Sequence, residues 1–112
     1  MLHILLFFLL AVQPGQPTTK VFEITAYCPC SKCCGTGSPG ITASGKPAVG
    51  RIIAAPKSIP FGARMWIPGY GLGVVEDRGG AIKGNRLDVL FPTHKQALQW
   101  GRQKLLVIIL TD

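Results

Sequence analysis

The chain of 112 residues is long enough for one domain at most, and a hydrophobic content of 47% excludes an intrinsically disordered protein. Its 14 Gly and 9 Pro follow no period, which excludes a collagen-like or low-complexity chain. A net charge of +7 favours anionic partners, namely wall polymers, membrane surfaces or nucleic acid. Because the basic residues are scattered and no zinc-finger or RNP motif accompanies them, we expect no nucleic-acid partner.

The N-terminal segment predicts export. Residues 2–12 form an apolar run broken only by His3, too short to span a membrane and of the length of a signal-peptide core. The run has no early Lys or Arg and no clear cleavage site, so a buried strand or an uncleaved anchor is the alternative. We therefore divide the chain into a leader (1–19) and a mature domain (20–112). We expect a monomer in the periplasm, cell wall, outer membrane or extracellular space, with no stable protein partner.

Short strands separated by Gly and Pro are expected after the leader, at residues 20–27, 51–54, 64–67, 72–76, 86–91 and 104–110. One helix follows Thr93, which can cap it and which forms a T-x-x-Q capping box with Gln96, and Gly101 is placed to end it. Many short strands with one short helix predict an all-β protein that closes into a small barrel, because closure leaves no unpaired strand edge.

All four cysteines lie in one heptapeptide that follows the first strand: Cys28, Cys30, Cys33 and Cys34. In an oxidising compartment they predict two disulfides of undetermined pairing, although a bridge between the adjacent Cys33 and Cys34 would be strained. A zinc site is the less favoured alternative, because four ligands within seven residues are cramped. A reactive thiol is the least favoured, since no histidine is expected nearby. No other cofactor is expected.

Residues 74–91 carry the candidate chemistry. They are expected to form a strand, a glycine-rich connection and a second strand, in which Leu87 and Val89 face the core and Asp88 faces away. A hairpin of these strands would bring Asp77 near Asp88. Two carboxylates in an apolar groove raise one pKa, and a carboxylic acid that stays protonated can protonate a glycosidic oxygen. The alternative is that Asp77 forms a turn and that Asp88 is a surface acid paired with Arg86 or Arg78.

The segment EDRGGAIKGNRLDVLF resembles the signature of the 3D domain family, which is named for three aspartates. Further similarity lies in Thr25-Ala26-Tyr27, in Ile41-Thr42-Ala43-Ser44-Gly45 and in the block from Ala55 to Gly62. The segments Trp66-Ile67-Pro68-Gly69-Tyr70-Gly71 and Trp100-Gly101-Arg102 also fit the family. The resemblance covers about residues 25–110. It departs from the family at Ala55, which stands where relatives have the first aspartate.

The resemblance implies a six-stranded double-psi β-barrel and lytic transglycosylase activity on the β-1,4 bond between N-acetylmuramic acid and N-acetylglucosamine. Asp88 corresponds to the acid/base residue of such enzymes, and Asp77 is the second candidate catalytic residue. The glycan strand would be contacted by Thr25, Tyr27, Tyr70, Gly79, Gly80, Lys83 and Asn85.

A barrel that binds glycan without cutting it is the alternative function, favoured by Ala55 and by the absence of a second domain. In either case, Trp66 and Trp100 are expected to be core and helix anchors, and Tyr27 and Tyr70 are the better candidates for sugar contacts.

Overall fold

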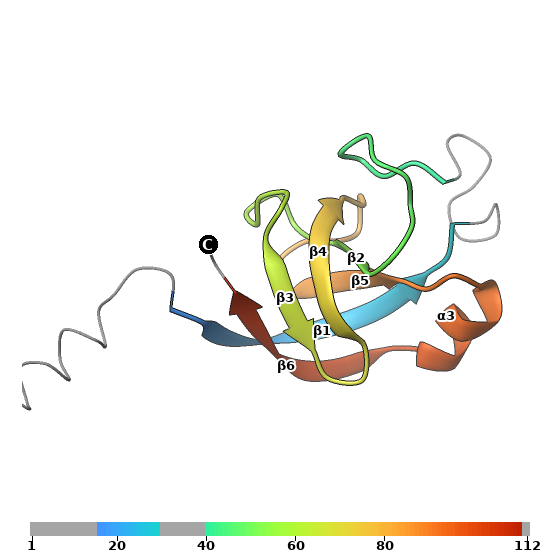
Figure 1. Cartoon of the computed structure of the whole chain (residues 1–112). Helices are drawn as coiled ribbons and strands as arrows, with labels where there is room; N and C mark the ends of the chain where they lie inside the picture. Colours follow the sequence, from blue (N-terminus) through green and yellow to red (C-terminus); the bar gives the residue numbers. More distant parts are fainter. Residues whose placement is uncertain (1–15, 30–39, 111–112) are drawn as a thin grey trace, which may run out of the picture.

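The computed structural model describes residues 16–29 and 40–110. These residues form six strands and one short helix (Figure 1). The elements in chain order are β1 (Thr18–Tyr27), β2 (Ile52–Ala54), β3 (Arg64–Ile67), β4 (Gly71–Asp77), β5 (Arg86–Leu90), α3 (His94–Trp100) and β6 (Gln103–Leu110).

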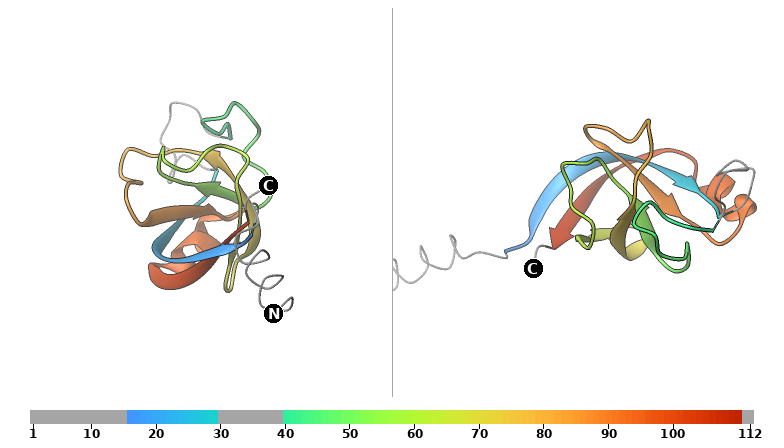
Figure 2. Two further views of the ribbon diagram at one scale, coloured as in Figure 1. Left: turned by 90° about the vertical axis from the view of Figure 1, so that its left-hand side faces the viewer. Right: turned by 90° about the horizontal axis from the view of Figure 1, so that it is seen from above.

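The six strands close into a barrel in the order β1-β5-β2-β4-β3-β6. Two pairs are parallel, β1 with β5 and β2 with β4, and the other pairs are antiparallel. Figure 2 shows the wrapped sheet from two further sides, with α3 at the opposite end of the molecule from the start of β1. The expected class, an all-β double-psi barrel with one short helix, is therefore confirmed.

Strand β1 begins at Thr18, two residues before the expected start of the mature domain. Thr18 and Thr19 pair with Ile109 and Ile108 of β6. The two additional residues of β1 are therefore held by pairing with a strand near the other end of the chain. The apolar run of the predicted leader lies outside the described residues. Within the described part of the chain, no helix is long and apolar enough to span a bilayer.

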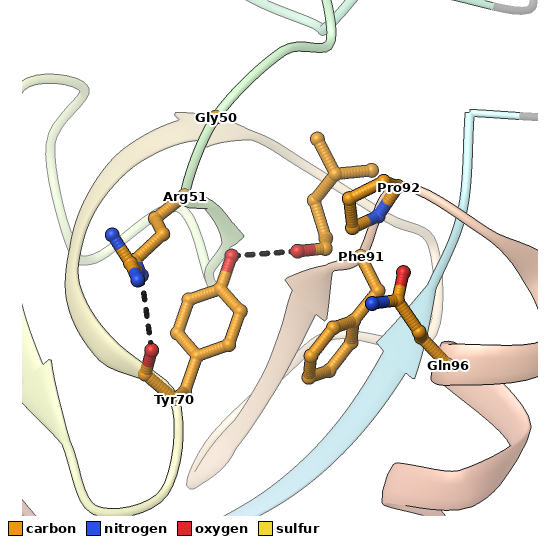
Figure 3. A pocket seen from close by; sticks show the side chains of 7 residues that line it. Gly50, Arg51, Tyr70, Phe91, Pro92 and Gln96 are labelled. Atoms are coloured by element: carbon orange, nitrogen blue, oxygen red, sulfur yellow. Dashed lines mark hydrogen bonds between the residues drawn. The ribbon is translucent and has the colours of Figure 1, made fainter.

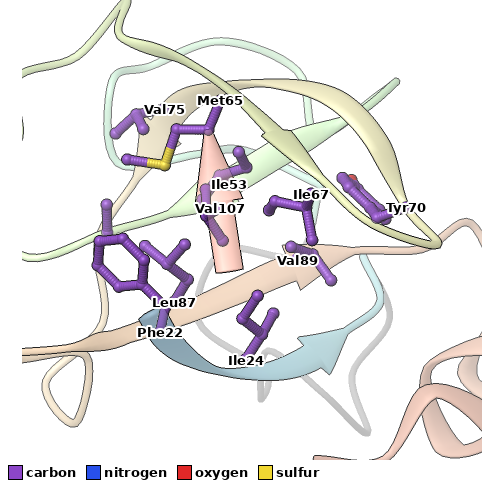
Figure 4. Packing of buried hydrophobic residues seen from close by; sticks show 11 residues of the cluster. Phe22, Ile24, Ile53, Met65, Ile67, Tyr70, Val75, Leu87, Val89 and Val107 are labelled. Carbon is purple, nitrogen blue, oxygen red and sulfur yellow. The ribbon is translucent and has the colours of Figure 1, made fainter. Parts of the chain in front are cut away.

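The barrel interior is filled by aliphatic residues from all six strands (Figure 4). Leu87 and Val89 of β5 are fully buried, which confirms the expected alternation, and Asp88 faces out of the barrel between them. Leu90 shares the outward side with Asp88 but is buried in a second cluster, with Ala48 and Ile52. Burying a Leu or Val side chain stabilises a fold by about 1.5–3 kcal/mol, so these strands hold Asp88 in a fixed place.

Helix α3 is capped as expected and closes one end of the barrel. Thr93 Oγ1 accepts a hydrogen bond from the Gln96 backbone N–H at 3.2 Å, and Gly101 ends the helix with a φ of 68°. Trp100 donates from Nε1 to the Ile24 carbonyl at 3.2 Å and packs against the core, as an anchor should. The same expectation is wrong for Trp66, which is 46% exposed because the register of β3 turns Met65 and Ile67 inward instead.

Candidate functional site

The expected hairpin of β4 and β5 is not formed, because β2 lies between these strands. Ala54 of β2 is the register partner of Asp77 on one side and of Asp88 on the other. The two aspartates therefore flank Ala54 on neighbouring strands. They come together through a parallel and an antiparallel pairing of β2, and not through a turn.

Asp88 is half-buried and is held by one hydrogen-bond donor. Thr25, its partner on the parallel strand β1, donates from Oγ1 to Asp88 Oδ1 at 3.0 Å. Burial raises the pKa of Asp88, and the nearby Asp77 raises it further. The Thr25 hydrogen bond and the charge of Arg86 act in the opposite direction without cancelling the rise. Asp88 is thus a carboxyl group whose neutral form is favoured by its surroundings.

The alternative in which Asp88 is a surface acid in an ion pair does not hold within the described residues. Arg86 lies 4.0 Å from Glu23 and donates to the Ala81 carbonyl. Arg78 donates to the carbonyls of Ala55, Asp77 and Ile59, and its guanidinium lies 4.1 Å from the centroid of the Phe61 ring. Arg78 therefore braces the connection after β2 and does not pair with Asp88.

Asp77 is surrounded by donors. Its Oδ2 accepts from the Tyr27 hydroxyl at 2.7 Å, and its Oδ1 accepts from the backbone N–H groups of Ala43 and Arg78, each at 2.9 Å. Burial, followed by the hydrogen bond to Asp77, raises the pKa of Tyr27 well above its ordinary range, so this phenol stays protonated as a donor. The second candidate aspartate thus joins β1, β4 and the segment around Ala43.

A buried acid, Glu76, holds the same segment from the next position of β4. It accepts from Ser44 Oγ at 2.8 Å and pairs with Lys46 Nζ at 3.0 Å, and these two bonds lower its pKa. The Ser44 N–H also donates to the Glu76 carbonyl at 3.1 Å. The contacts of Ser44 and Lys46 with Glu76 were not predicted from the sequence, because the position of an acid in a strand does not indicate which distant residues bind it.

Four of the predicted substrate-contact residues line two different cavities of the structure. Gly79, Gly80 and Lys83 line one cavity of about 560 Å³ together with residues 56–58, Arg78, Ile82 and Gly84. Asn85 is exposed at the edge of another hollow, which is lined by Glu23 and Lys104 among others, and its carbonyl accepts from the Glu23 N–H. The glycine-rich connection therefore faces two hollows.

The expected sugar contact at Tyr70 stays a prediction: Tyr70 lines a pocket of about 350 Å³ with Arg51 and Phe91, but most of its side chain is buried. The side chain is only 8% exposed, its hydroxyl donates to the Leu90 carbonyl at 2.7 Å, and its ring packs edge-on against Phe91 (Figure 3). The ring also packs edge-on against Trp100. Burial raises the pKa of Tyr70 well above its ordinary range, so it stays a neutral donor inside the barrel. Tyr70 belongs to the core cluster, against which Phe91 and Trp100 also pack.

Of the cysteines, only Cys28 lies within the described residues; Cys30, Cys33 and Cys34 lie outside them. The disulfide and zinc expectations therefore stay predictions. Among the described residues, no group of three or more His, Cys, Asp and Glu side chains could hold a metal ion. The argument that no histidine is near the cluster is wrong, because Cys28 Sγ lies 3.7 Å from His94 Nδ1. The start of α3 packs on the end of β1 and brings them together.

Ala55, which replaces the first aspartate of the resemblance, follows β2 directly and is fully buried. Its N–H donates to the Asp77 carbonyl at 3.2 Å, and its carbonyl accepts from Arg78. The site therefore has two aspartates, and its third position is an apolar part of the barrel core.

A profile of the 3D domain matches residues 51–111, which include the cavity-lining connections and both aspartates. The chain belongs to the 3D domain family. It is 37% identical over 101 residues to the cell wall shaping protein YabE of Bacillus subtilis, covering 88% of this chain and 25% of that protein. It is 39% identical over 79 residues to the cell wall-binding protein YocH of the same organism, covering 66% of this chain and 28% of that protein.

Among solved structures, MltA from E. coli has a TM-score of 0.54 and 29% sequence identity to this 3D domain chain, over 66% of this chain and 28% of MltA. The chain thus spans between a quarter and a third of the length of each of these relatives.

Proposed function

We propose that this 3D domain cleaves peptidoglycan as a lytic transglycosylase, with Asp88 as its acid/base residue. The observation that supports this most is the setting of Asp88: half-buried, raised in pKa, and oriented by Thr25. The relatives named for cell wall shaping and cell wall binding, and the barrel of MltA, agree with a role at the wall. We also propose an exported, wall-associated location, which the names of the same relatives and the apolar run at residues 2–12 support.

In the proposed reaction, protonated Asp88 donates its proton to the glycosidic oxygen as the bond from that oxygen to C1 of N-acetylmuramic acid breaks. The resulting carboxylate then takes the proton of the muramic acid 6-hydroxyl as that oxygen bonds to C1. The product is a 1,6-anhydro sugar, and Asp88 regains its proton. One residue serves both steps, so neither a second catalytic carboxylate nor an activated water is needed. Asp77 positions the site through its three donors.

The test is the mass analysis of products after incubation of the full chain with purified peptidoglycan. We expect anhydromuropeptides from the natural chain and, because a positioned general acid contributes about 10²–10⁴-fold, their near-complete loss in Asp88→Asn. Circular dichroism should show that the variant is folded. Reducing or hydrolysed ends without anhydro sugars would exclude the transglycosylase mechanism.

A glycan-binding barrel without turnover is the second candidate, and Ala55 is the observation that favours it. A buried methyl group replaces a carboxylate beside the Asp77 carbonyl, so the site lacks one of the charges of its family. Co-sedimentation with peptidoglycan that is unchanged in Asp88→Asn, together with no released product, would support binding over cleavage.

We also propose that Cys28 is held in a disulfide with Cys30, Cys33 or Cys34 in the exported protein. Cys28 is fully buried at the end of β1, beside Thr25 and Tyr27, where a covalent link would restrain the site. Peptide mapping without reductant should find the cross-linked peptide. Four alkylated thiols in protein isolated from outside the cell would contradict this proposal.

A further inference from the structure

The cavity lined by the connection after β2 and by the glycine-rich connection holds cations that no acid of the described residues neutralises. Lys57 comes from the first connection and Lys83 from the second, and both are exposed. The four described acids are bound elsewhere: Glu23 to Arg102, Glu76 to Lys46, Asp77 to its three donors and Asp88 to Thr25. The cavity therefore has a positive charge available to a ligand.

The walls of this cavity are fixed. Pro56 and Ile82 are buried, and the Ile82 N–H closes a turn onto the Gly79 carbonyl at 3.0 Å. Arg78 stands in the wall with its guanidinium on the Phe61 ring and bonded to the Ala55 and Ile59 carbonyls. Two exposed lysines thus line a cavity of about 560 Å³ together with the buried, apolar Pro56 and Ile82.

Residues that line the cavity are close in sequence to the residues of the aspartate site. Pro56 stands two residues after Ala54, the register partner of both aspartates, and Arg78 follows Asp77 directly. The cavity therefore lies within a few residues of the strand positions that carry the two aspartates, close enough for one polymer to contact both.

We propose that this cavity is a subsite for a carboxylate of the peptide stem of peptidoglycan. The identity of the polymer rests on the function proposed above. The stem is attached to the muramic acid whose bond is to be cleaved, and its carboxylates stand on short aliphatic groups. A pair of lysine ammonium groups over an apolar floor suits that combination of charge and hydrocarbon. The subsite would make the enzyme prefer strands that retain their stems over bare glycan.

The experiment measures binding of the full chain to peptidoglycan sacculi stripped of teichoic acid, in an Asp88→Asn background so that no bond is cut. The subsite variant is Lys57→Gln/Lys83→Gln. Its matched control is Lys20→Gln/Lys95→Gln, which removes the same charge from exposed lysines of β1 and α3. We expect the subsite variant to bind about tenfold more weakly and the control to lose less than about twofold, since an exposed charge contact is worth little unless it is specific.

The second arm repeats the measurement on sacculi whose carboxylates have been converted to amides. The subsite and control variants should then bind equally. Gly80→Leu provides a variant that keeps every charge: a Cβ at Gly80 meets no atom within 4 Å, so a longer side chain can fill the cavity. It should reproduce the loss on native sacculi.

Equal losses in the two double variants would overturn the subsite, and so would a difference that persists after amidation. A difference that appears only when teichoic acid is left on the wall would assign the cavity to phosphate and overturn the proposal for carboxylate. Because binding is measured without turnover, the subsite can stand or fall independently of the anhydro products that test the proposed function.

Discussion

The two aspartates of the site lie on either side of Ala54, yet their surroundings differ in kind. Asp77 accepts from three donors that belong to β1, to the segment around Ala43 and to its own strand. Asp88 accepts from the single hydroxyl of Thr25, and burial raises its pKa. The first carboxylate is a structural acceptor that ties three segments together, and the second is a half-buried carboxyl with one donor and a raised pKa.

This difference shows how one barrel can give two identical groups of one site different surroundings. Each hydrogen bond to a carboxylate favours its charged form, while burial without such bonds favours the neutral form. The number of donors within reach is the basis on which we propose Asp88, and not Asp77, as the acid/base residue, and the following variants test that division.

The largest effect on stability is expected from Asp77→Ala. It leaves the Tyr27 hydroxyl and the N–H groups of Ala43 and Arg78 without their acceptor, and unsatisfied donors of this kind cost about 1–3 kcal/mol each when buried. We expect the free energy of unfolding, measured with urea, to fall by about 3 kcal/mol. The matched variant Asp88→Ala should lose less than about 1 kcal/mol, because Thr25 also reaches the Leu87 carbonyl. Equal losses would remove the proposed division.

Glu76→Gln should have the next largest effect, because it removes the ion pair with Lys46 and weakens the bond to Ser44. We expect a loss of about 1–2 kcal/mol at neutral pH. The pKa of Glu76 is lowered by folding, so its stabilisation is present above the ordinary glutamate pKa and is lost as the pH falls through the lowered value. Urea denaturation across acidic pH should therefore show a shallower fall for Glu76→Gln than for the natural chain. A fall of the same steepness would mean that Glu76 is not the group responsible.

Tyr27→Phe should cost about 1 kcal/mol, since it keeps the ring in the cluster with Leu90 and removes only the hydroxyl that donates to Asp77. A double-mutant cycle sharpens the comparison between the aspartates. Tyr27→Phe with Asp77→Ala should show a coupling energy of about 1 kcal/mol, and Tyr27→Phe with Asp88→Ala should show almost none. Strong coupling to Asp88 would mean that the two carboxylates act as one unit.

The features predicted correctly from the sequence are those that depend on neighbours along the chain. Alternation in residues 86–91 places Asp88 outside the barrel, and the Thr93 and Gln96 pattern identifies the helix start. The strand order was not predictable, because the insertion of β2 between β4 and β5 depends on pairings between distant segments. The hairpin expected for Asp77 and Asp88 failed for that reason, although both residues still reach the site.

The errors at individual side chains have a similar cause. Turn residues surround Tyr70 in the sequence, but contacts with Phe91 and Trp100 bury most of its side chain. The approach of His94 to Cys28 likewise depends on where α3 packs. The hydrogen bond of Ser44 and the ion pair of Lys46 with Glu76 join segments about thirty residues apart in the chain. No local sequence pattern indicates these contacts.

The smallest effect, and the most specific one, is expected from Thr25→Val. Because the Thr25 hydroxyl favours the ionised form of Asp88, its removal should raise the pKa of Asp88 further. The carboxyl carbon of Asp88, followed by NMR as pH is varied, measures this without any activity. If Asp88 is the proton donor, the fall of cleavage with rising pH should move to higher pH by the same amount. Thr25→Ser keeps the hydroxyl and should leave both curves in place. An unchanged or lower pKa in Thr25→Val would show that another group sets the protonation of Asp88.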